Sequence, residues 1–116
     1  MPVHYKRADR VAALIKEEVS QLVLKELGDP SLGFLTITKV RCSDDLRYAK
    51  IYYSVLGTEE KRKNAAAVLQ RALGHIRGEI GHRLNLRFVP EIQFFYDDSA
   101  EYAEHIETLL KKIKSE

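Results

Sequence analysis

Residues 61–87 read KRKNAAAVLQRALGHIRGEIGHRLNLR, a stretch patterned as a helix but interrupted by glycines. Its apolar positions keep one helical phase throughout, which predicts that a single buried face continues across the interruption. A glycine inside a helix costs about 1 kcal/mol relative to alanine, and Gly74 and Gly78 lie only about one turn apart. We therefore expect two helices joined at a kink near Ala72, Leu73 and Gly74.

The same stretch concentrates positive charge. It holds seven basic residues against one acid, Glu79, whereas the whole chain has 19 Lys and Arg against 17 Asp and Glu. The seven are Lys61, Arg62, Lys63, Arg71, Arg77, Arg83 and Arg87. A solvated helix face is the usual explanation of a charge run. Here the charge coincides with a break where glycines let a polyanion approach the backbone, which favours nucleic acid as the partner.

Size and composition indicate one ordinary globular domain. The chain has 116 residues, 45% of them apolar and 31% charged, which is enough for one buried core, so we expect a single domain over 1–116. Cys42 has no second thiol for an internal disulfide. No apolar run is long enough to cross a bilayer, and residues 1–10 lack the apolar stretch of a secretion signal. These features favour the cytoplasm and give no membrane partner.

On the N-terminal side, apolar residues recur at helical spacing over 10–27. Asp9 is the expected N-cap and Gly28 the expected stop of this helix. Extended segments follow at 34–42 and 48–56, rich in Thr, Val, Ile and Tyr and joined by a polar turn. They predict an antiparallel hairpin.

Within the hairpin, the alternation of apolar residues changes parity along the first strand, which predicts a bulge near Thr38. In the second strand the alternation places Tyr53 in the core. It leaves open whether Tyr48 and Tyr52 stack on nucleic-acid bases.

On the C-terminal side of the basic stretch, residues 87–96 predict a third strand, and Pro90 places it at an edge or a bulge because proline lacks an N–H. A last helix is expected to start at Asp98 or Ser99, and Thr58 to cap the helix before the kink. The order is helix, strand, strand, helix, kink, helix, strand, helix. It predicts an α+β fold, a two-layer sandwich with a three-stranded sheet.

This order resembles the type II KH fold, an RNA-binding fold that normally carries a GxxG loop between its two central helices. Here the junction reads Ala72-Leu73-Gly74 instead. The sequence further resembles the ribosome-binding factor A family over nearly its whole length. The likeness rests on RVA at 10–12, DPSLG at 29–33, DLRYAKIY at 45–52, RALGHIR at 71–77 and RLNLRFVPEIQFFYD at 83–97.

The resemblance implies a KH-like fold with an additional C-terminal helix and a bacterial assembly factor without enzymatic activity. Such a factor would bind the small ribosomal subunit and its RNA late in maturation and support ribosomal RNA processing, a role most needed in the cold. No cofactor is implied.

The residues expected to meet RNA lie mainly along the basic stretch. Phosphate contacts are expected from Lys61, Arg62, Arg71, Arg77, Arg83 and Arg87 around a surface shaped by Ala72, Leu73 and Gly74. His75, one turn from Arg71, is either a further contact or an ordinary surface residue. A second contact is expected from Lys6, Arg7 and Arg10.

Residues 78–81, GEIG, match the GxxG pattern literally but do not suit an RNA clamp. Glu79 would point a negative charge at phosphate, and Ile80 continues the buried helical face. Gly78 and Gly81 are better explained as packing space beside a strand.

Paired carboxylates at Asp44-Asp45 and at Asp97-Asp98 suggest acid–base chemistry, but both pairs sit where turns and helix caps use aspartate. The four histidines are scattered without metal-ligand spacing. We therefore expect no catalytic residue and no metal site.

Another class of function stays open, a module that holds a protein partner through its sheet or its final helix. Survival of the complex after nuclease treatment would distinguish it from an RNA-binding factor. No apolar surface stripe is evident in the sequence, so we expect a monomer.

Overall fold

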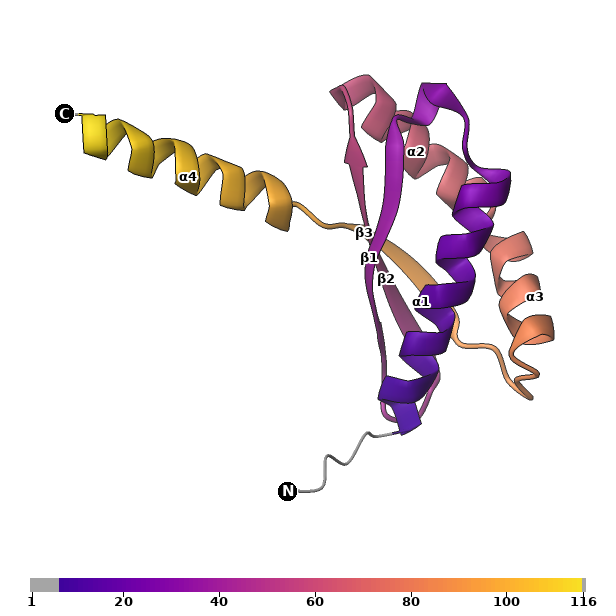
Figure 1. Ribbon diagram of the computed structural model, residues 1–116. Helices are drawn as coiled ribbons and strands as arrows, with labels where there is room; N and C mark the ends of the chain where they lie inside the picture. Colours follow the sequence, from indigo (N-terminus) through magenta and orange to yellow (C-terminus); the bar gives the residue numbers. More distant parts are fainter. Residues whose placement is uncertain (1–6, 116) are drawn as a thin grey trace, which may run out of the picture.

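The computed structural model describes residues 7–115, which form a small sheet with helices (Figure 1). The elements are α1 (Arg7–Glu26), the 3-10 helix η1 (Pro30–Leu32), β1 (Phe34–Cys42), β2 (Tyr48–Leu56), α2 (Glu59–Arg71), α3 (Leu73–Arg83), β3 (Glu91–Tyr96) and α4 (Ser99–Ser115). The predicted order and the kink between two central helices are confirmed.

The three strands are ordered β1-β2-β3, with β1 and β2 antiparallel and β2 and β3 parallel. The predicted hairpin is confirmed, and α2 and α3 form the crossover that a parallel pair requires. The register shifts between Ile37 and Lys39, which confirms the bulge at Thr38. Because the bulge adds one residue, Val40 and Cys42 pack on the core beyond it.

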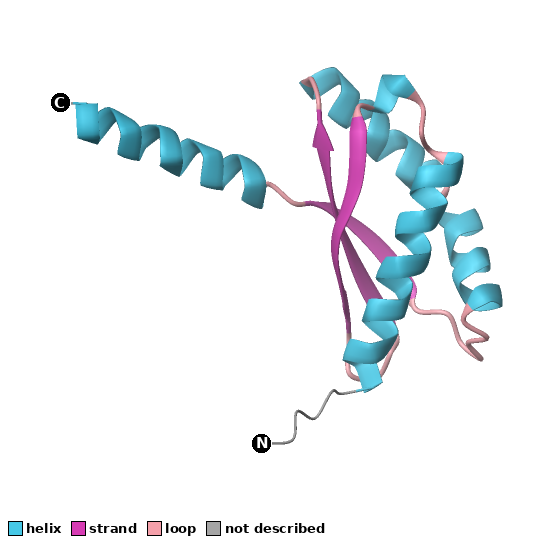
Figure 2. Ribbon diagram, viewed as in Figure 1, coloured by secondary structure: helices cyan, strands magenta, loops and turns pink. Residues whose placement is uncertain are grey.

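Helices α1, α2 and α3 lie on one face of the sheet (Figure 2), so the α+β two-layer sandwich is confirmed. The core lies between the layers and is apolar. Its fully buried side chains include Ile15 and Val19 of α1, Ile51 of β2, Leu69 of α2, and Ile76 and Ile80 of α3. The helical face predicted to continue across the glycines is therefore buried on both sides of the kink. Tyr53 is buried too, as predicted.

Three helix starts were predicted, one of them wrongly; the last helix, α4, does begin at Ser99. α1 begins at Arg7, so Asp9 lies in its first turn, where its charge favours the helix dipole, and does not cap it. Thr58 does cap α2, because its hydroxyl accepts a 3.2 Å hydrogen bond from the Lys61 amide.

The third strand is shorter than predicted. β3 begins at Glu91, which pairs with Tyr48, the first residue of β2, so no ladder is available to earlier residues. The chain before it turns through Asn85, whose φ is +51°. Phe88, expected in the sheet, is 78% exposed. β3 does lie at an edge of the sheet, which is what Pro90 predicted.

α4 extends away from the other three helices (Figure 1). Its apolar residues are exposed, namely Tyr102, Ile106, Leu109, Leu110 and Ile113. The expectation that the chain carries no apolar surface stripe is therefore wrong, because this helical face is not covered within the described residues. None of the described helices is long and apolar enough to span a membrane.

Candidate nucleic-acid interface

A single residue separates α2 from α3. The amide of Ala72 donates to the carbonyl of Val68 and closes α2, and α3 begins at Leu73 with no side chain capping its N-terminus. A Cβ atom placed on Gly74 would meet no atom within 4 Å. The junction is thus an accessible helix start, where backbone amides and the helix dipole favour an anion.

Arg71 and His75 flank the junction, and both are exposed. Nε of Arg71 donates a 3.4 Å hydrogen bond to the carbonyl of Ala67 in its own helix, and no carboxylate pairs with it among the described residues. Nε2 of His75 lies 2.8 Å from Oε2 of Glu26 at the end of α1. Of the two, Arg71 presents the unneutralised charge.

Arg77 is used inside the fold. Its Nε donates a 3.2 Å hydrogen bond to the carbonyl of Pro90, and its Nη2 donates a 3.1 Å bond to the carbonyl of Val89. These bonds fix the segment that leads into β3. Arg77 was predicted to contact phosphate, but its guanidinium is already hydrogen-bonded to two backbone carbonyls of the fold.

Arg83 lies between two carboxylates. Its Nε donates to Glu79 at 3.0 Å and its Nη1 to Glu18 of α1 at 3.3 Å. The hydrogen bond from Arg83 lowers the pKa of Glu79, so that carboxylate stays ionised at neutral pH. The charge of Arg83 is consequently offset by its neighbours.

Lys61 and Arg62 lie at the other end of α2, about 15 to 20 Å from the junction for a helix of this length. Nη2 of Arg62 is 2.7 Å from Oε1 of Glu101, and its guanidinium lies 5.4 Å from the ring centroid of Tyr96. Arg62 therefore anchors the first turn of α4 to α2. Lys61 is half-buried beside Gly57.

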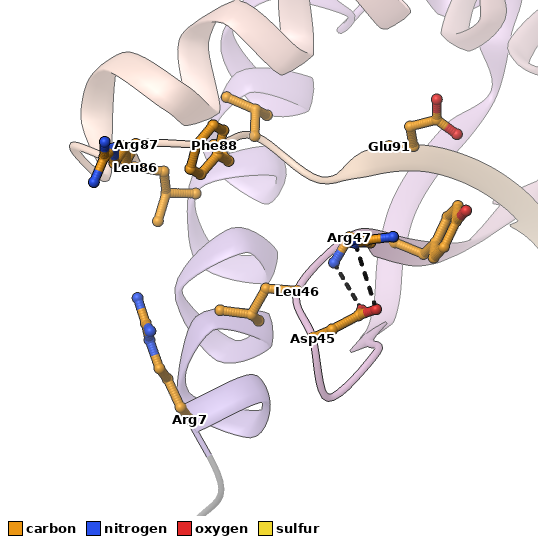
Figure 3. Close-up of a pocket in the computed structure, with 10 residues that line it drawn as sticks. Arg7, Asp45, Leu46, Arg47, Leu86, Arg87, Phe88 and Glu91 are labelled. Carbon is orange, nitrogen blue, oxygen red and sulfur yellow. Dashed lines mark hydrogen bonds and ion pairs between the residues drawn. The ribbon is translucent and has the colours of Figure 1, made fainter.

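A groove of about 710 Å³ lies at the far end of α3, between the start of α1, the β1–β2 turn and the loop before β3 (Figure 3). Arg7, Arg47 and Arg87 line it. Figure 3 shows Arg7 extending from α1 toward the loop that carries Arg87. The guanidinium of Arg87 lies 5.5 Å from the ring centroid of Phe88, and Arg47 is 3.8 Å from Asp45. This combination of arginines with an exposed aromatic ring suits a nucleotide.

The groove brings together residues that were predicted to form two separate RNA contacts, and it includes one residue that was not predicted. Arg7 and Arg87 belong to different predicted groups, whereas Arg47 was not predicted. Its amide carbonyl accepts a 2.8 Å hydrogen bond from the Glu91 amide, because β2 and β3 run parallel and their starts lie side by side. Recognising that parallel pairing would have placed Arg47 near residue 87.

The rest of the predicted second contact is less defined. Arg10 is exposed on α1 and does not line the groove. Lys6 lies outside the described residues.

The GEIG segment lies entirely within α3 and forms no loop. Ile80 is fully buried, as predicted. A Cβ on Gly81 would lie 2.6 Å from Cγ2 of Val89, so this glycine does provide packing space, although against the loop before β3 and not against a strand. For Gly78 the prediction is wrong, because nothing lies within 4 Å of its Cβ position.

The cations of the basic stretch do not form one cluster, contrary to expectation. Three of them lie at the start of α2, Arg71 lies at the α2–α3 junction, and Arg87 lines the groove. Arg77 and Arg83 are elsewhere on α3, bonded to the loop before β3 and to carboxylates of α1 and α3. Successive residues of a helix point to different sides of it. Carboxylates that are distant in sequence, such as Glu18 and Glu101, also neutralise some of these cations. Arg71 and the groove arginines remain the most available.

One aspartate of each pair has structural hydrogen-bond partners. Oδ1 of Asp45 accepts hydrogen bonds from the Ser43 hydroxyl and the Arg47 amide within the turn. Oδ1 of Asp97 accepts one from the Ser99 amide at the start of α4. Within residues 7–115, no group of three or more His, Cys, Asp or Glu side chains is placed to hold a metal ion.

Comparison with known proteins identifies the family of the chain. The family model described as ribosome-binding factor A matches residues 7–110. This chain belongs to the ribosome-binding factor A family. Ribosome-binding factor A of Geobacter metallireducens is 51% identical over 112 residues, which cover 97% of this chain and 95% of that one.

Solved structures of family members share the fold. The crystal structure of ribosome-binding factor A from Thermus thermophilus has a TM-score of 0.65 and 25% identity, covering 77% of this chain and 94% of that one. A homology model of the Thermus thermophilus protein, fitted into a cryo-EM map of a 30S–RbfA complex, reaches a TM-score of 0.69 at 25% identity and covers 80% of this chain and 97% of that one.

Proposed function

We propose that this protein binds the small ribosomal subunit and its RNA during late maturation and supports ribosomal RNA processing. Membership of the ribosome-binding factor A family over residues 7–110 supports this, as does a relative fitted into a 30S complex. The structural observation that carries the proposal is the exposed Arg71, which pairs with no carboxylate within residues 7–115 and lies beside the uncapped first turn of α3.

Phosphate contacts come first from arginines that form no ion pair, or only an exposed one, within residues 7–115. Arg71 at the junction and Arg7, Arg47 and Arg87 around the groove lie toward the two ends of α3, about 16 Å apart for its 11 residues. Lys61 and Arg10 extend the contact. A phosphate backbone following α3 would meet both groups.

Three further residues contact RNA by exchanging a carboxylate partner for a phosphate, namely His75, Arg83 and Arg62. Each is held by a carboxylate in a pair that is partly solvent-exposed. Such pairs are worth only about 0 to 1 kcal/mol, so replacing a carboxylate by a phosphate costs little. Arg77 does not exchange in this way, because releasing it would leave the carbonyls of Val89 and Pro90 without a donor.

The factor acts by binding and performs no catalysis. A ligand changes a folding RNA only by preferring one of its conformers, so its effect is a preference for one state of the maturing subunit. Asp45 accepts hydrogen bonds within a turn and Asp97 accepts one at a helix start, which supports a structural role for them. The site of action is the cytoplasm, and the need is greatest in the cold.

A second candidate is a module that holds a protein. The exposed apolar stripe of α4 favours it, because such a helical face ordinarily packs against another surface. An association with subunits that survives complete nuclease digestion would support this candidate.

The test is co-sedimentation with separated ribosomal subunits. The wild-type chain should migrate with small subunits and not with large ones. The double variant Arg71→Ala/Arg87→Ala should bind at least tenfold more weakly. The matched control Lys111→Ala/Lys114→Ala, which removes the same charge from α4, should bind like wild type. Equal loss in both variants would contradict the assigned surface.

A further inference from the structure

The helices α1, α2 and α3 leave the opposite face of the sheet uncovered (Figure 2). The strand register places cations and aromatic rings side by side on that face. The register aligns Lys39 of β1, Tyr52 of β2 and Phe95 of β3 in one row across the strands. Arg41 and Lys50 lie in the next row. The β1 bulge creates this arrangement, because it turns residues 39 and 41 outward where unbroken alternation would turn them inward.

The side chains in these rows contact one another. The rings of Tyr52 and Phe95 are stacked, with centroids 5.6 Å apart and planes at 30°. Nζ of Lys39 lies 4.5 Å from the Tyr52 centroid, and Nζ of Lys50 lies 5.8 Å from the Phe95 centroid. Phe95 is 38% exposed. The rows therefore form an ordered strip of rings and ammonium groups with an accessible ring at its β3 end.

The charge of this face is positive. Lys39, Arg41 and Lys50 point outward, and the three strands carry only one outward carboxylate among the described residues, Glu91. None of the three cations forms an ion pair within residues 7–115. Asp97, just beyond β3, is close enough to feel the charge of Lys39. Burial of these cations under an apolar protein surface would be costly, whereas an anionic polymer would pair with them.

We propose that this open face is a second RNA surface, which binds a single-stranded segment by stacking a base on Phe95, whose ring Tyr52 supports, and placing phosphates beside Lys39, Arg41 and Lys50. Stacking platforms bordered by cations recognise single strands because every base offers a ring face. The inference rests on the proposed RNA partner. It extends that function to the opposite side of the molecule from the α2–α3 junction.

The chain contains no tryptophan, so one can be introduced as a reporter. The Phe95→Trp variant should lose fluorescence when titrated with a single-stranded RNA of about 12 nucleotides, within the length that such platforms cover. The control is Phe34→Trp, at an exposed position of the same face about 13 Å along the strands. It should show little change. Equal quenching at both positions, or none at residue 95, would overturn the proposal.

Affinity provides the second readout. Phe95→Leu keeps an apolar side chain but removes the ring, and should weaken oligonucleotide binding about 5- to 100-fold, as loss of one stacked base does. Phe34→Leu should not. Lys39→Gln/Lys50→Gln should reduce the slope of log K against log salt by about 1.4, since a single strand contributes about 0.7 per phosphate. Wild-type affinity and slope in these variants would contradict the assignment.

Parallel sedimentation with small subunits separates this inference from the function on which it rests. Subunit binding by wild type, with no effect of the Phe95 and Lys variants on the oligonucleotide, would overturn the second surface and leave the function standing. Failure of wild type to bind subunits would overturn the function itself. If Phe95→Leu weakened subunit binding but not oligonucleotide binding, the face would contact a ribosomal protein and the RNA proposal would fall.

Discussion

The hydroxyl of Thr38 donates a 2.7 Å hydrogen bond to Oδ2 of Asp97, which lies 59 residues further along the chain. β1 and β3 are not neighbours in the sheet, so this bond links the bulge of the first strand to the end of the third across β2. The amide of Asp97 also donates to the carbonyl of Tyr53 on β2. The bulge that turns Lys39 and Arg41 outward is thus hydrogen-bonded to the residue that precedes α4.

Replacing Thr38 by valine should test this tie. The variant keeps a β-branched side chain, which suits a strand, but removes the donor to Asp97. We expect a loss of about 1 kcal/mol in the free energy of unfolding, measured by urea denaturation. Thr36→Val, at an exposed position of the same strand, is the matched control and should change stability by less than half as much. Identical effects would show that the Thr38 bond contributes nothing specific.

Stability should also depend on pH through Asp97. Hydrogen bonds from Ser99 and Thr38 lower the pKa of Asp97 from its ordinary 3.8 to about 2. Because the folded-state pKa lies below the unfolded value, the ionised carboxylate stabilises the fold above about pH 4, and this contribution disappears as the pH falls toward 2. Asp97→Asn should therefore be less stable than wild type at pH 7, and the difference should shrink between pH 4 and 2. A difference that is constant across this range would contradict the assignment.

Arg77 and Arg71 should respond differently to substitution. Arg77→Lys keeps the charge but cannot reproduce the two hydrogen bonds to the carbonyls of Val89 and Pro90, and should lower the free energy of unfolding by about 1 to 3 kcal/mol. Arg71→Ala should leave stability within about 0.5 kcal/mol of wild type, as exposed substitutions do, while weakening subunit binding. Thermal unfolding and sedimentation together measure both. The reverse pattern would exchange the roles of the two arginines.

The two glycines of the GEIG segment should also differ. Gly81→Ala places a Cβ 2.6 Å from Cγ2 of Val89 and should destabilise the fold by about 1 to 3 kcal/mol. Gly78→Ala meets open space and should stabilise α3 by up to about 1 kcal/mol. Unfolding temperatures will separate them. RNA affinity that fell in the stabilised Gly78→Ala variant would revive this segment as an RNA clamp.

The elements with a clear period were predictable from the sequence. The composition and the alternation of apolar and polar residues over 34–42 and 48–56 predicted both strands with their observed bounds. The change in which positions are apolar predicted the bulge at Thr38. The glycines at 74 and 78 indicated the break after Arg71. The start of β3 was not predictable in this way, because it depends on where β2 begins and on the donors of Arg77.

The site was harder to predict because charge in a sequence does not reveal its partners. Arg83 looked free beside a backbone break, yet Glu18, 65 residues away, comes within 3.3 Å of it. Arg62 is paired with Glu101 of a helix whose direction the sequence did not give. Conversely, Arg47 became a candidate only once parallel strands placed it beside the loop of Arg87.

The most direct test of the central claim is the affinity of the wild-type chain for purified small subunits as a function of salt concentration. If about four phosphates are neutralised, log K should fall against log salt with a slope of about −3 to −4, and Arg71→Ala/Arg87→Ala should reduce that slope by about 2. An affinity that does not change with salt, in wild type and variant alike, would contradict phosphate docking at the junction and the groove.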